Sequence, residues 1–407
     1  MIKRVKLGEI ASLKTGPFGT QFSAKEYVSS GIPVINVKNI GYGQIITDGL
    51  EYVSEDTKTR LSEHVLQTGD IVFGRKGSVD RHAYISDEYA GWVQGSDCIR
   101  LRFQTGINTR YVSHFLKLDY VKKQINHSAV GSTMASLNTD ILRNLEILIP
   151  ELEVQNEIEN ALSLLEEKIK LNSRTSTELE SLAKTIYDYW FLQFEFPNEE
   201  GLPYKSSGGK MVWSEELKRE IPEGWNTTTI GDITICHDSK RIPLKSKERS
   251  FRKGTYPYYG ATTVMDYIDE YIFDGDYVLL AEDGSVMDDK GYPIIQRITG
   301  KTWVNNHAHV LEPIRGYNCK ALMLLLKDVP VVKIKTGSIQ MKITQENLNR
   351  YNILDIPIKY LSKITPILED IDKLQLKLIG ENRELAALRD WLLPMLMNGQ
   401  VGFKDVE

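Results

Sequence analysis

The sequence repeats one plan twice, and this duplication constrains the fold more than any other feature. Short motifs recur in the same order, which chance matches of such small motifs would not keep. The matched segments are 6–10 (KLGEI) with 229–233 (TIGDI), 69–72 (GDIV) with 275–278 (GDYV), 77–79 (GSV) with 284–286 (GSV), 130–133 (VGST) with 336–339 (TGSI), and 149–150 (IP) with 356–357 (IP). The copies lie 223 residues apart at Gly8 and Gly231 but 206 apart at Gly69 and Gly275, which predicts an extra loop in the first copy between about positions 34 and 68.

Each copy is rich in short β-type runs that Gly and Asp residues interrupt. We expect strands at 32–37, 70–73 and 98–103 in the first copy, and at 256–259, 277–280 and 309–312 in the second. Helical patches are expected at 109–126 and 319–327. The pattern predicts two similar α+β globules, each with a β-rich core.

A long helical pattern follows each copy. Apolar residues recur at alternating spacings of three and four, which is typical of a coiled-coil seam. The predicted helix-pairing residues are Ile158, Leu162, Leu165, Ile169, Leu179, Ile186, Ile367, Ile371, Leu374, Leu378, Leu385 and Leu388. Asn172, Ser176 and Glu381 are polar members of the same stripes, and they could either fix the register or face solvent at a local break. Alternatively, each helix packs only on its own globule, but two matching stripes favour pairing with each other.

We therefore expect an antiparallel coiled coil that joins the two globules with pseudo-twofold symmetry. From Pro150 to Trp190 the first helix would span roughly 60 Å. B-DNA repeats about every 34 Å, so such a frame suits two globules that read one duplex. The expected domains are 1–150 (first recognition domain), 151–197 (first helix), 198–228 (linker, rich in Gly, Pro and Ser), 229–357 (second recognition domain) and 358–407 (second helix).

Charge and composition limit the classes of function that this chain can have. The formal net charge is −5, but residues 1–150 contain 18 basic and 15 acidic residues, whereas 151–197 contain 4 and 10. The acidic excess therefore lies in a helix, which leaves room for a basic face on each globule. The longest apolar run, 321–326, is too short for a membrane span, and the basic start without an apolar stretch predicts no signal peptide. Cys98, Cys236 and Cys319 form no Cys-x-x-Cys motif, so we expect a cytoplasmic protein without disulfides.

No catalytic motif is complete in this sequence. Gly300-Lys301-Thr302 lacks the first glycine of a phosphate loop, because position 295 is Ile295. His307 and His309 could share a strand face as metal ligands, but no third ligand is near in sequence, so a polar strand-end cluster is favoured. The acidic pairs at 282–283 and 288–289 could bind Mg²⁺ in a nuclease, yet the first copy has 75–76 (RK) and 80–81 (DR) there. The chain is also without the Asn/Asp-Pro-Pro-aromatic motif of adenine methyltransferases.

A binding role is therefore favoured over a catalytic one, with neither a catalytic residue nor a metal ligand expected. Glycine-flanked loops carry the polar and basic side chains that read base edges or contact phosphates. The candidate DNA-binding residues are Lys14, Thr15, Thr20, Gln21, Arg75, Lys76, Ser78, Arg81, Ser132, Thr133, Lys240, Arg241, Lys245, Ser338, Gln340 and Lys342. Each of them, taken singly, is more typical of solvated surface or of a phosphate contact than of base reading.

The whole chain resembles the specificity subunit of type I restriction-modification systems. The segments that carry the resemblance are 14–20 (KTGPFGT), 197–201 (PNEEG), 206–211 (SSGGKM), 221–225 (IPEGW), 256–261 (YPYYGA), 271–281 (YIFDGDYVLLA), 306–309 (NHAH) and 388–395 (LRDWLLPM). The resemblance implies two target-recognition domains that each read half of a split DNA site. It also implies two conserved helices, which form an antiparallel coiled coil and set the gap between the halves.

The resemblance further implies partners that carry the chemistry. Two modification subunits would bind S-adenosylmethionine and methylate adenine at N6, and restriction subunits would use ATP and Mg²⁺ to cut unmodified DNA. Because the target adenine must leave the base stack, the recognition domain would help to hold a distorted duplex. The chain itself would be a non-catalytic, double-stranded DNA-binding subunit without a cofactor of its own. The rival hypotheses are a fused restriction-methylation enzyme or nuclease, and a pure scaffold.

Overall fold

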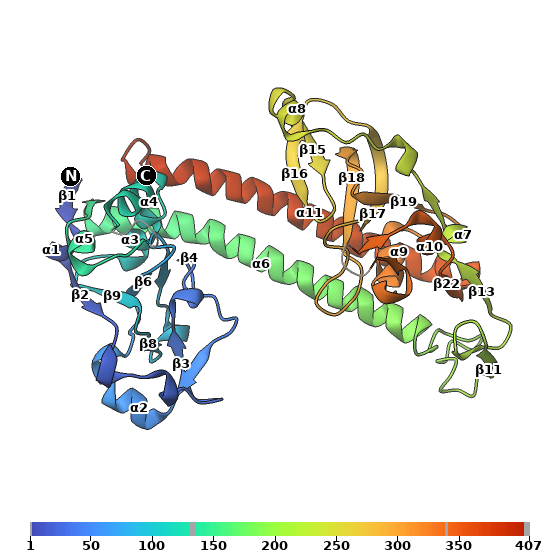
Figure 1. Cartoon of the computed structure of the whole chain (residues 1–407), viewed down its shortest axis with the longest axis horizontal. Helices are drawn as coiled ribbons and strands as arrows, with labels where there is room; N and C mark the ends of the chain where they lie inside the picture. The colour runs from blue at the N-terminus through green and yellow to red at the C-terminus, as the bar shows by residue number, and fades with distance from the viewer. Residues whose placement is uncertain (1, 130–134, 338–340, 403–407) are drawn as a thin grey trace, which may run out of the picture. The chain divides into compact units, whose positions relative to one another are not determined.

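The structure is a computed structural model that describes residues 2–129, 135–337 and 341–402. It divides into two compact units, here called unit 1 (Met1–Leu171 with Glu381–Glu407) and unit 2 (Asn172–Gly380). Two long helices, α6 (Leu152–Phe191) and α11 (Ile358–Met397), contribute to both units (Figure 1). Each unit therefore contains one segment of α6, one segment of α11 and one globular domain.

Unit 1 is built on a five-stranded sheet of order β2-β9-β6-β7-β4, beside a three-stranded sheet β5-β3-β8 and a ribbon β1-β10. Its strands are β1 (Lys3–Lys6), β2 (Ala11–Thr15), β3 (Ile32–Ile35), β4 (Tyr42–Gly43), β5 (Glu51–Val53), β6 (Ile71–Gly74), β7 (His82–Tyr84), β8 (Val93–Gln94), β9 (Cys98–Phe103) and β10 (Glu146–Ile149). Its shorter helices are α1 (Leu7–Ile10), α2 (Glu55–Arg60), α3 (Thr109–Leu116), α4 (Asp119–Ser128) and α5 (Thr139–Arg143). The extra segment expected between about 34 and 68 supplies β4, β5 and α2.

Unit 2 is built on a six-stranded sheet of order β14-β19-β17-β18-β15-β16, with ribbons β13-β22, β11-β12 and β20-β21. Its strands are β11 (Met211–Ser214), β12 (Arg219–Pro222), β13 (Asn226–Thr229), β14 (Thr234–Cys236), β15 (Lys253–Tyr259), β16 (Val264–Ile268), β17 (Phe273–Ala281), β18 (Ile295–Val304), β19 (Ala308–Pro313), β20 (Lys335–Thr336), β21 (Lys342–Ile343) and β22 (Asn352–Asp355). Its shorter helices are α7 (Ile230–Ile233), α8 (Ser246–Phe251), α9 (Cys319–Leu326) and α10 (Gln345–Asn349).

The two units repeat one topology. The antiparallel order β2-β9-β6 recurs as β14-β19-β17, and the ribbon β1-β10 recurs as β13-β22. The KLGEI and TIGDI motifs form the one-turn helices α1 and α7. A Cβ on Gly8 would lie 3.1 Å from the Arg143 side chain, and one on Gly231 would lie 3.0 Å from Asn349. Glycine recurs at this position because the helix packs closely on α5 or α10.

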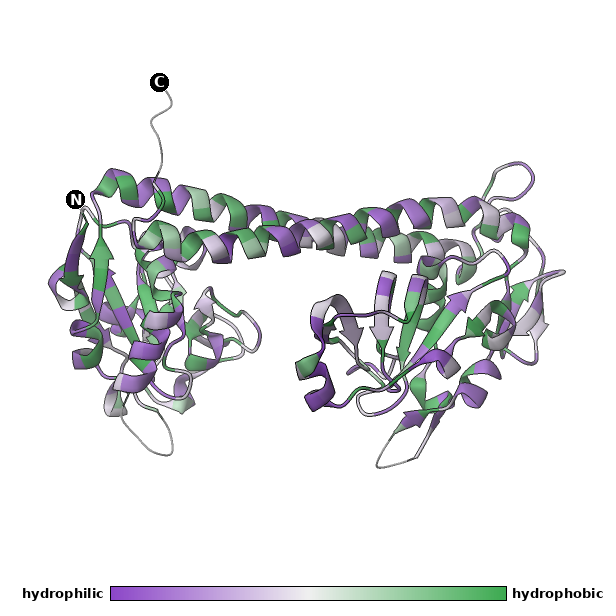
Figure 2. Cartoon of the chain, turned by 90° about the horizontal axis from the view of Figure 1, so that it is seen from above, coloured by the Kyte–Doolittle hydropathy of each residue, from purple (hydrophilic) through white to green (hydrophobic). Residues whose placement is uncertain are grey.

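The apolar core of each unit includes the long-helix segments. In unit 1, Ile158 and Leu162 of α6 and Leu396 of α11 are buried in the same cluster as the sheet residues Phe73 and Leu101. In unit 2, Tyr187 of α6 and Ile364 of α11 are buried with the strand residues Val278 and Leu311. In Figure 2 hydrophobic and hydrophilic residues alternate along both long helices, as expected when one face of each helix is buried.

The α6 and α11 segments pair in antiparallel fashion within each unit. In unit 1, the Asn382 side-chain amide donates to the Ile169 carbonyl (3.2 Å), and Lys168 pairs with Glu381 (3.4 Å). In unit 2, the Gln375 amide donates to the Ser176 carbonyl (2.8 Å). Ile158 of α6 shares the core of unit 1 with Leu396 of α11, and Tyr187 shares the core of unit 2 with Ile364, so within each unit the residue numbers rise on α6 as they fall on α11. The predicted fold class, α+β with two similar β-rich domains and two long antiparallel helices, is thus confirmed.

The phase of the α11 seam differs from the prediction at three positions. Ile367, Leu374 and Leu388 are 46, 43 and 44% exposed and do not belong to the seam. The residues that follow them, Leu368, Gln375 and Arg389, are more buried and continue a three-four spacing through Ile364, Ile371, Leu378, Asn382, Leu385 and Leu392. The predicted stripe had Glu381 as its one polar member on α11, and this residue also lies one position before the seam residue Asn382. The seam instead contains Gln375 and Asn382, whose side chains bond to α6. The other predicted pairing residues are buried or half-buried.

Two further segments differ from their sequence-based descriptions. Leu118 has an extended backbone (ψ 135°) that separates α3 from α4, so the helix expected at 109–126 is two helices. The segment 198–228, expected as a linker, contains a β-hairpin, and an aromatic cluster anchors its surroundings. Phe196 is fully buried, with ring centroids 4.8 Å from Trp225 and 4.3 Å from Tyr360 at the start of α11.

Candidate nucleic-acid interface

A loop that follows the central strand occupies the same place in both units. We call these loops junction loop 1 (residues 75–81, after β6) and junction loop 2 (residues 282–288, after β17). Leu137 N–H donates to the Arg75 carbonyl (2.8 Å), and Ile343 N–H donates to the Glu282 carbonyl (2.8 Å). Isolated bridges then join Lys76 to Ser136 and Asp283 to Lys342. Each loop is thereby fixed to the chain that leads into α5 or α10.

The recurring Gly-Ser-Val motif explains the shape of both loops. Gly77 and Gly284 have φ angles of 78° and 75°, a left-handed conformation that glycine adopts without strain. The following Val79 and Val286 are fully buried, and each N–H donates back to the glycine carbonyl. The glycine makes the turn and the valine anchors it, so the residues around them are free to differ between the units.

Junction loop 1 presents two arginines that stack on exposed aromatic rings. The Arg75 guanidinium lies 4.9 Å from the ring centroid of Phe18, and that of Arg81 lies 5.6 Å from the Tyr42 ring. Such cation–π contacts orient a guanidinium while leaving most of its N–H groups available. The Nε atoms of both arginines are buried and have no hydrogen-bond partner within the described ranges. Unpaired buried donors of this kind are rare in proteins.

A polar loop of unit 1, residues 16–21, meets junction loop 1 through Phe18. Its entry is tight, since a Cβ on Gly16 would lie 1.9 Å from the Gly95 carbonyl oxygen. Thr20 and Gln21 lie exposed in a short 3-10 turn (Gly19–Gln21) at its tip. Lys14, by contrast, pairs with Glu63, and this hydrogen bond lowers the pKa of Glu63. The Lys14 charge is therefore already compensated.

In unit 2 an arginine holds junction loop 2 from within. The Arg241 side chain, 11% exposed, contacts Glu282 (2.6 Å), Asp238 (3.2 Å) and the Ala308 carbonyl (2.7 Å). Lys342 contacts the other Glu282 oxygen (2.9 Å). Burial on its own would raise the pKa of Glu282, but hydrogen bonds from Arg241 and Lys342 outweigh it and lower this pKa. Arg241 thus supports the loop, while Lys342 lies at its surface.

Comparison with known proteins places this arrangement in a family. The type I restriction modification DNA specificity domain family matches residues 2–181 and 222–387, which is one match for each repeat. The chain belongs to this family. The specificity family thus accounts for the duplication, because its domain occurs twice in this chain.

Individual relatives of this specificity-family chain match all of it or a part of it. The MjaIX type I restriction enzyme specificity subunit of Methanocaldococcus jannaschii is 23% identical over 433 aligned positions, which cover 100% of this chain and 94% of the relative. A putative type I specificity subunit of Haemophilus influenzae, S.HindORF215P, is 34% identical over 145 residues, 36% of each chain. The crystal structure of a type I S subunit from M. genitalium superposes with a TM-score of 0.61 at 16% identity, covering 98% of this chain and 96% of that one.

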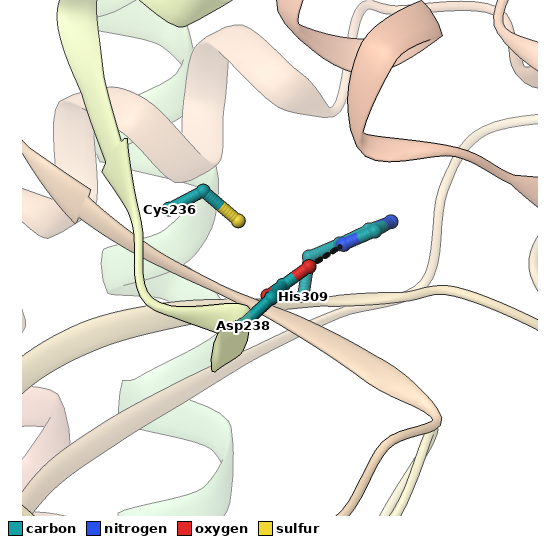
Figure 3. Close-up of side chains that lie close together, drawn as sticks. All are labelled: Cys236, Asp238 and His309. Carbon is teal, nitrogen blue, oxygen red and sulfur yellow. Dashed lines mark hydrogen bonds and ion pairs between the residues drawn. The ribbon is translucent and has the colours of Figure 1, made fainter. Parts of the chain in front are cut away.

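The specificity-family chain also contains a buried Cys-Asp-His cluster that sequence reasoning missed. His309 is 1% exposed; its Nδ1 lies 2.5 Å from Asp238 Oδ2, and its Nε2–H donates to the Ile343 carbonyl (2.9 Å) (Figure 3). Asp238 also accepts from the Val310 N–H (3.0 Å). Asp238 precedes His309 by 71 residues, so only the pairing of β14 with β19 brings them together.

The geometry of this cluster is that of a hydrogen-bonded network. Ligands of one zinc ion each lie about 2.0–2.2 Å from the metal, which keeps a nitrogen and an oxygen ligand farther apart than 2.5 Å at tetrahedral angles. The third member, Cys236, is protonated, because burial together with the Asp238 carboxylate raises its pKa to about 12. His307, expected on the same face as His309, instead bonds to Asp283 (2.7 Å). The network fixes β14, β19 and β21 beneath junction loop 2.

The other predicted residues of this specificity-family chain lie on separate elements. Thr15 ends β2 and is half-buried, Ser78 is exposed in junction loop 1, Lys240 is exposed after β14, and Lys245 is exposed before α8. Ser132, Thr133, Ser338 and Gln340 lie outside the described residues. The structure therefore brings together Arg75 with the 16–21 loop, and Arg241 with Lys342. Among the described helices, none has both the length and the apolar composition that a bilayer crossing requires.

Proposed function

We propose that this chain is the DNA-reading and assembly subunit of a type I restriction-modification complex. Each unit reads one half of a bipartite duplex site through its junction loop and the loops beside it. The observation that carries the proposal is that both units contain an equivalent junction loop, fixed by an isolated bridge. Each junction loop lies within one of the two matches to the DNA specificity family. Catalysis, with S-adenosylmethionine, ATP and Mg²⁺, belongs to two modification subunits and to restriction subunits, and the complex works in the cytoplasm.

The exposed faces of the long helices support a docking role for the modification subunits. Large apolar side chains on these faces are 40% or more exposed at Leu164, Leu171, Leu388 and Trp391 in unit 1, and at Leu182, Tyr189, Ile367, Leu374 and Ile379 in unit 2. Trp and Tyr side chains are enriched at protein interfaces, and this set contains one of each. Three of these residues are those that the sequence pattern had assigned to the helix seam.

A methylation assay tests the proposal. The purified chain, a DNA library and labelled S-adenosylmethionine should give no methyl transfer until a modification subunit is added. Methylation should then occur at one bipartite motif. Transfer by the chain alone would favour the rival hypothesis of a fused restriction-methylation enzyme, and sequence-independent binding would favour a scaffold.

Replacing Arg75 by alanine should weaken specific DNA binding by about 1–3 kcal/mol, the cost of one lost arginine–base contact. Its guanidinium is oriented by Phe18, so Phe18→Ala should weaken binding in the same direction but less. Binding titrations at several salt concentrations measure the effect, since phosphate contacts would also change the salt slope. The matched control is Arg4→Ala, which removes an exposed arginine on β1. Equal losses of binding affinity in Arg75→Ala and Arg4→Ala would show that Arg75 contributes only its positive charge and no specific base contact.

A further inference from the structure

The two junction loops carry opposite charges at structurally equivalent positions. Arg75 N–H donates to the Asp97 carbonyl (2.8 Å), and Glu282 N–H donates to the His307 carbonyl (2.9 Å). These bonds make Asp97 equivalent to His307, and Lys76 equivalent to Asp283. In unit 1 the side chains of this pair are Lys76 and Asp97 (3.2 Å). In unit 2 they are Asp283 and His307 (2.7 Å), so the charged partners have exchanged places.

Asp283 points away from the buried network that its neighbour completes. Glu282 is 9% exposed and faces Arg241 and Lys342, whereas the Asp283 side chain is 36% exposed. Successive side chains of an extended segment point to opposite sides, and the bridge with Lys342 gives residue 283 that extended geometry. The Asp283 carboxylate therefore takes no part in the buried network. It faces the surface of the loop, where a binding partner can reach it.

His307 holds this carboxylate in one orientation. The His307 Nδ1 atom contacts Asp283 Oδ1. The backbone N–H of His307 donates to the Asn305 side chain (2.8 Å), and this bond fixes the turn before β19. Asp283 Oδ2 has no hydrogen-bond partner in the described part of the chain. The result is an oriented, exposed acceptor on the loop that corresponds to the arginine-bearing loop of unit 1.

We infer that Asp283 is a specificity-determining residue of unit 2 that accepts a hydrogen bond from the exocyclic amino group of a base in the major groove. This inference rests on the proposed function. A carboxylate only accepts hydrogen bonds, and the major-groove edges of cytosine (N4) and adenine (N6) offer amino donors. Guanine and thymine offer acceptors at the equivalent position and would repel it.

The charge exchange then gives the two units different base preferences at this loop. Arg75 and Lys76 donate, which suits the O6 and N7 acceptors of guanine. A carboxylate facing DNA also repels phosphates, so it weakens binding to every sequence that does not supply an amino group.

The test compares the full chain with its Asp283→Ala, Asp283→Asn and Glu346→Ala variants, all assembled with modification subunits. Duplexes carrying each of the four base pairs at every position of the recognised motif are titrated with each protein. Glu346→Ala is the matched control, because it removes an exposed carboxylate from α10. We expect Asp283→Ala to lose roughly ten- to a hundredfold discrimination at one position of the unit 2 half-site, with the unit 1 half-site unchanged. Asp283→Asn should shift preference at that position toward adenine.

Other outcomes overturn the inference and are separable from failure of the proposed function. Unchanged base preferences in Asp283→Ala, with wild-type binding still sequence-specific, would refute the inference alone. A uniform loss at all positions, with an altered unfolding transition, would show a structural role and refute it as well. Wild-type protein without any sequence preference would refute the proposed function itself. A loss of discrimination at a C·G pair assigns the contact to cytosine, and one at an A·T pair assigns it to adenine.

Discussion

Replacing Glu180 by alanine is expected to destabilise unit 2 by about 3–5 kcal/mol, the usual cost of leaving a buried charge without its partner. Lys320 on α9 is only 3% exposed, and its ammonium group donates to Glu180 of α6 and to the Gln375 side chain of α11 (2.6 Å). Lys327 donates to the other Glu180 oxygen (2.5 Å). One carboxylate thus joins three helices, and its loss leaves a buried ammonium ion uncompensated.

Urea unfolding of the full chain, followed by the fluorescence of tryptophans in unit 2 such as Trp190 and Trp225, measures this effect. The matched control is Glu178→Ala, two residues earlier on α6, where an exposed carboxylate pairs only with Arg174 (2.8 Å). That surface pair is worth about 0.3–0.5 kcal/mol. A loss below about 1 kcal/mol in the Glu180 variant would contradict the assignment of Lys320 as a buried charge.

The same ion pair predicts a specific acid sensitivity. Burial on its own would raise the pKa of Glu180, but hydrogen bonds from Lys320 and Lys327 lower it from 4.5 to about 2. A carboxyl whose folded-state pKa is depressed stabilises the fold above its unfolded-state pKa, and this contribution is lost as the pH falls through the folded-state pKa. Wild-type unit 2 should therefore lose stability between about pH 4.5 and pH 2. In Glu180→Gln this component should be absent from a pH series of unfolding free energies.

Exchanging residues 1–150 for the matching part of a relative is expected to replace one half of the recognised site and leave the other half unchanged. The five-stranded sheet and junction loop 1 lie entirely within this segment. Specific binding exceeds non-specific binding by roughly a thousandfold or more, so the change of motif should be complete. Methylome sequencing of cells that express the exchanged chain with its partner subunits reads out both halves at once.

The exchange must keep the contacts between the domain and its helix segments. Asn108 N–H donates to the Gln155 side chain of α6 (2.9 Å), and Lys117 pairs with Glu166 (2.7 Å). The relative that supplies the new segment must therefore keep these polar positions. It must also keep the apolar positions that face Ile158 and Leu162. Alteration of both half-sites in a stably folded exchange would argue against modular reading.

The architecture could be predicted from the sequence because the repeated motifs contain glycines that determine the path of the backbone. The Gly-Ser-Val turn needs glycine for a local reason, its left-handed backbone, so it is visible in a single sequence. The glycine of the KLGEI helix is needed for packing on a distant helix, and it was visible because both copies keep it. The seam of α11 was misassigned at Ile367, Leu374 and Leu388, because polar residues in a seam are satisfied by partners on a distant helix. The network of His309 and Asp238 depends on strand pairing across 71 residues and leaves no local signal.

The segment 198–228 shows the reverse limitation. Its Gly, Pro and Ser content is typical of a linker, yet three aromatic residues around it, Phe194, Phe196 and Trp225, are buried in the core of unit 2. The average composition of a segment does not reveal a few buried aromatic residues of this kind. Within the candidate site, Arg75 and Arg81 were recognisable in the sequence as surface donors, whereas the pairing of Lys14 and Arg241 with acidic residues required the folded structure.

Gln375 and Asn382 of α11 bond to main-chain carbonyl groups of α6, at residues 176 and 169, and Gln375 also donates to the Glu180 side chain. Every amino acid supplies such a carbonyl, so substitutions at these two α6 positions leave both acceptors in place. The alignment of the helices therefore depends little on which side chains stand at these two positions of α6. A recognition domain introduced with a foreign α6 segment would find the same two acceptors on that helix.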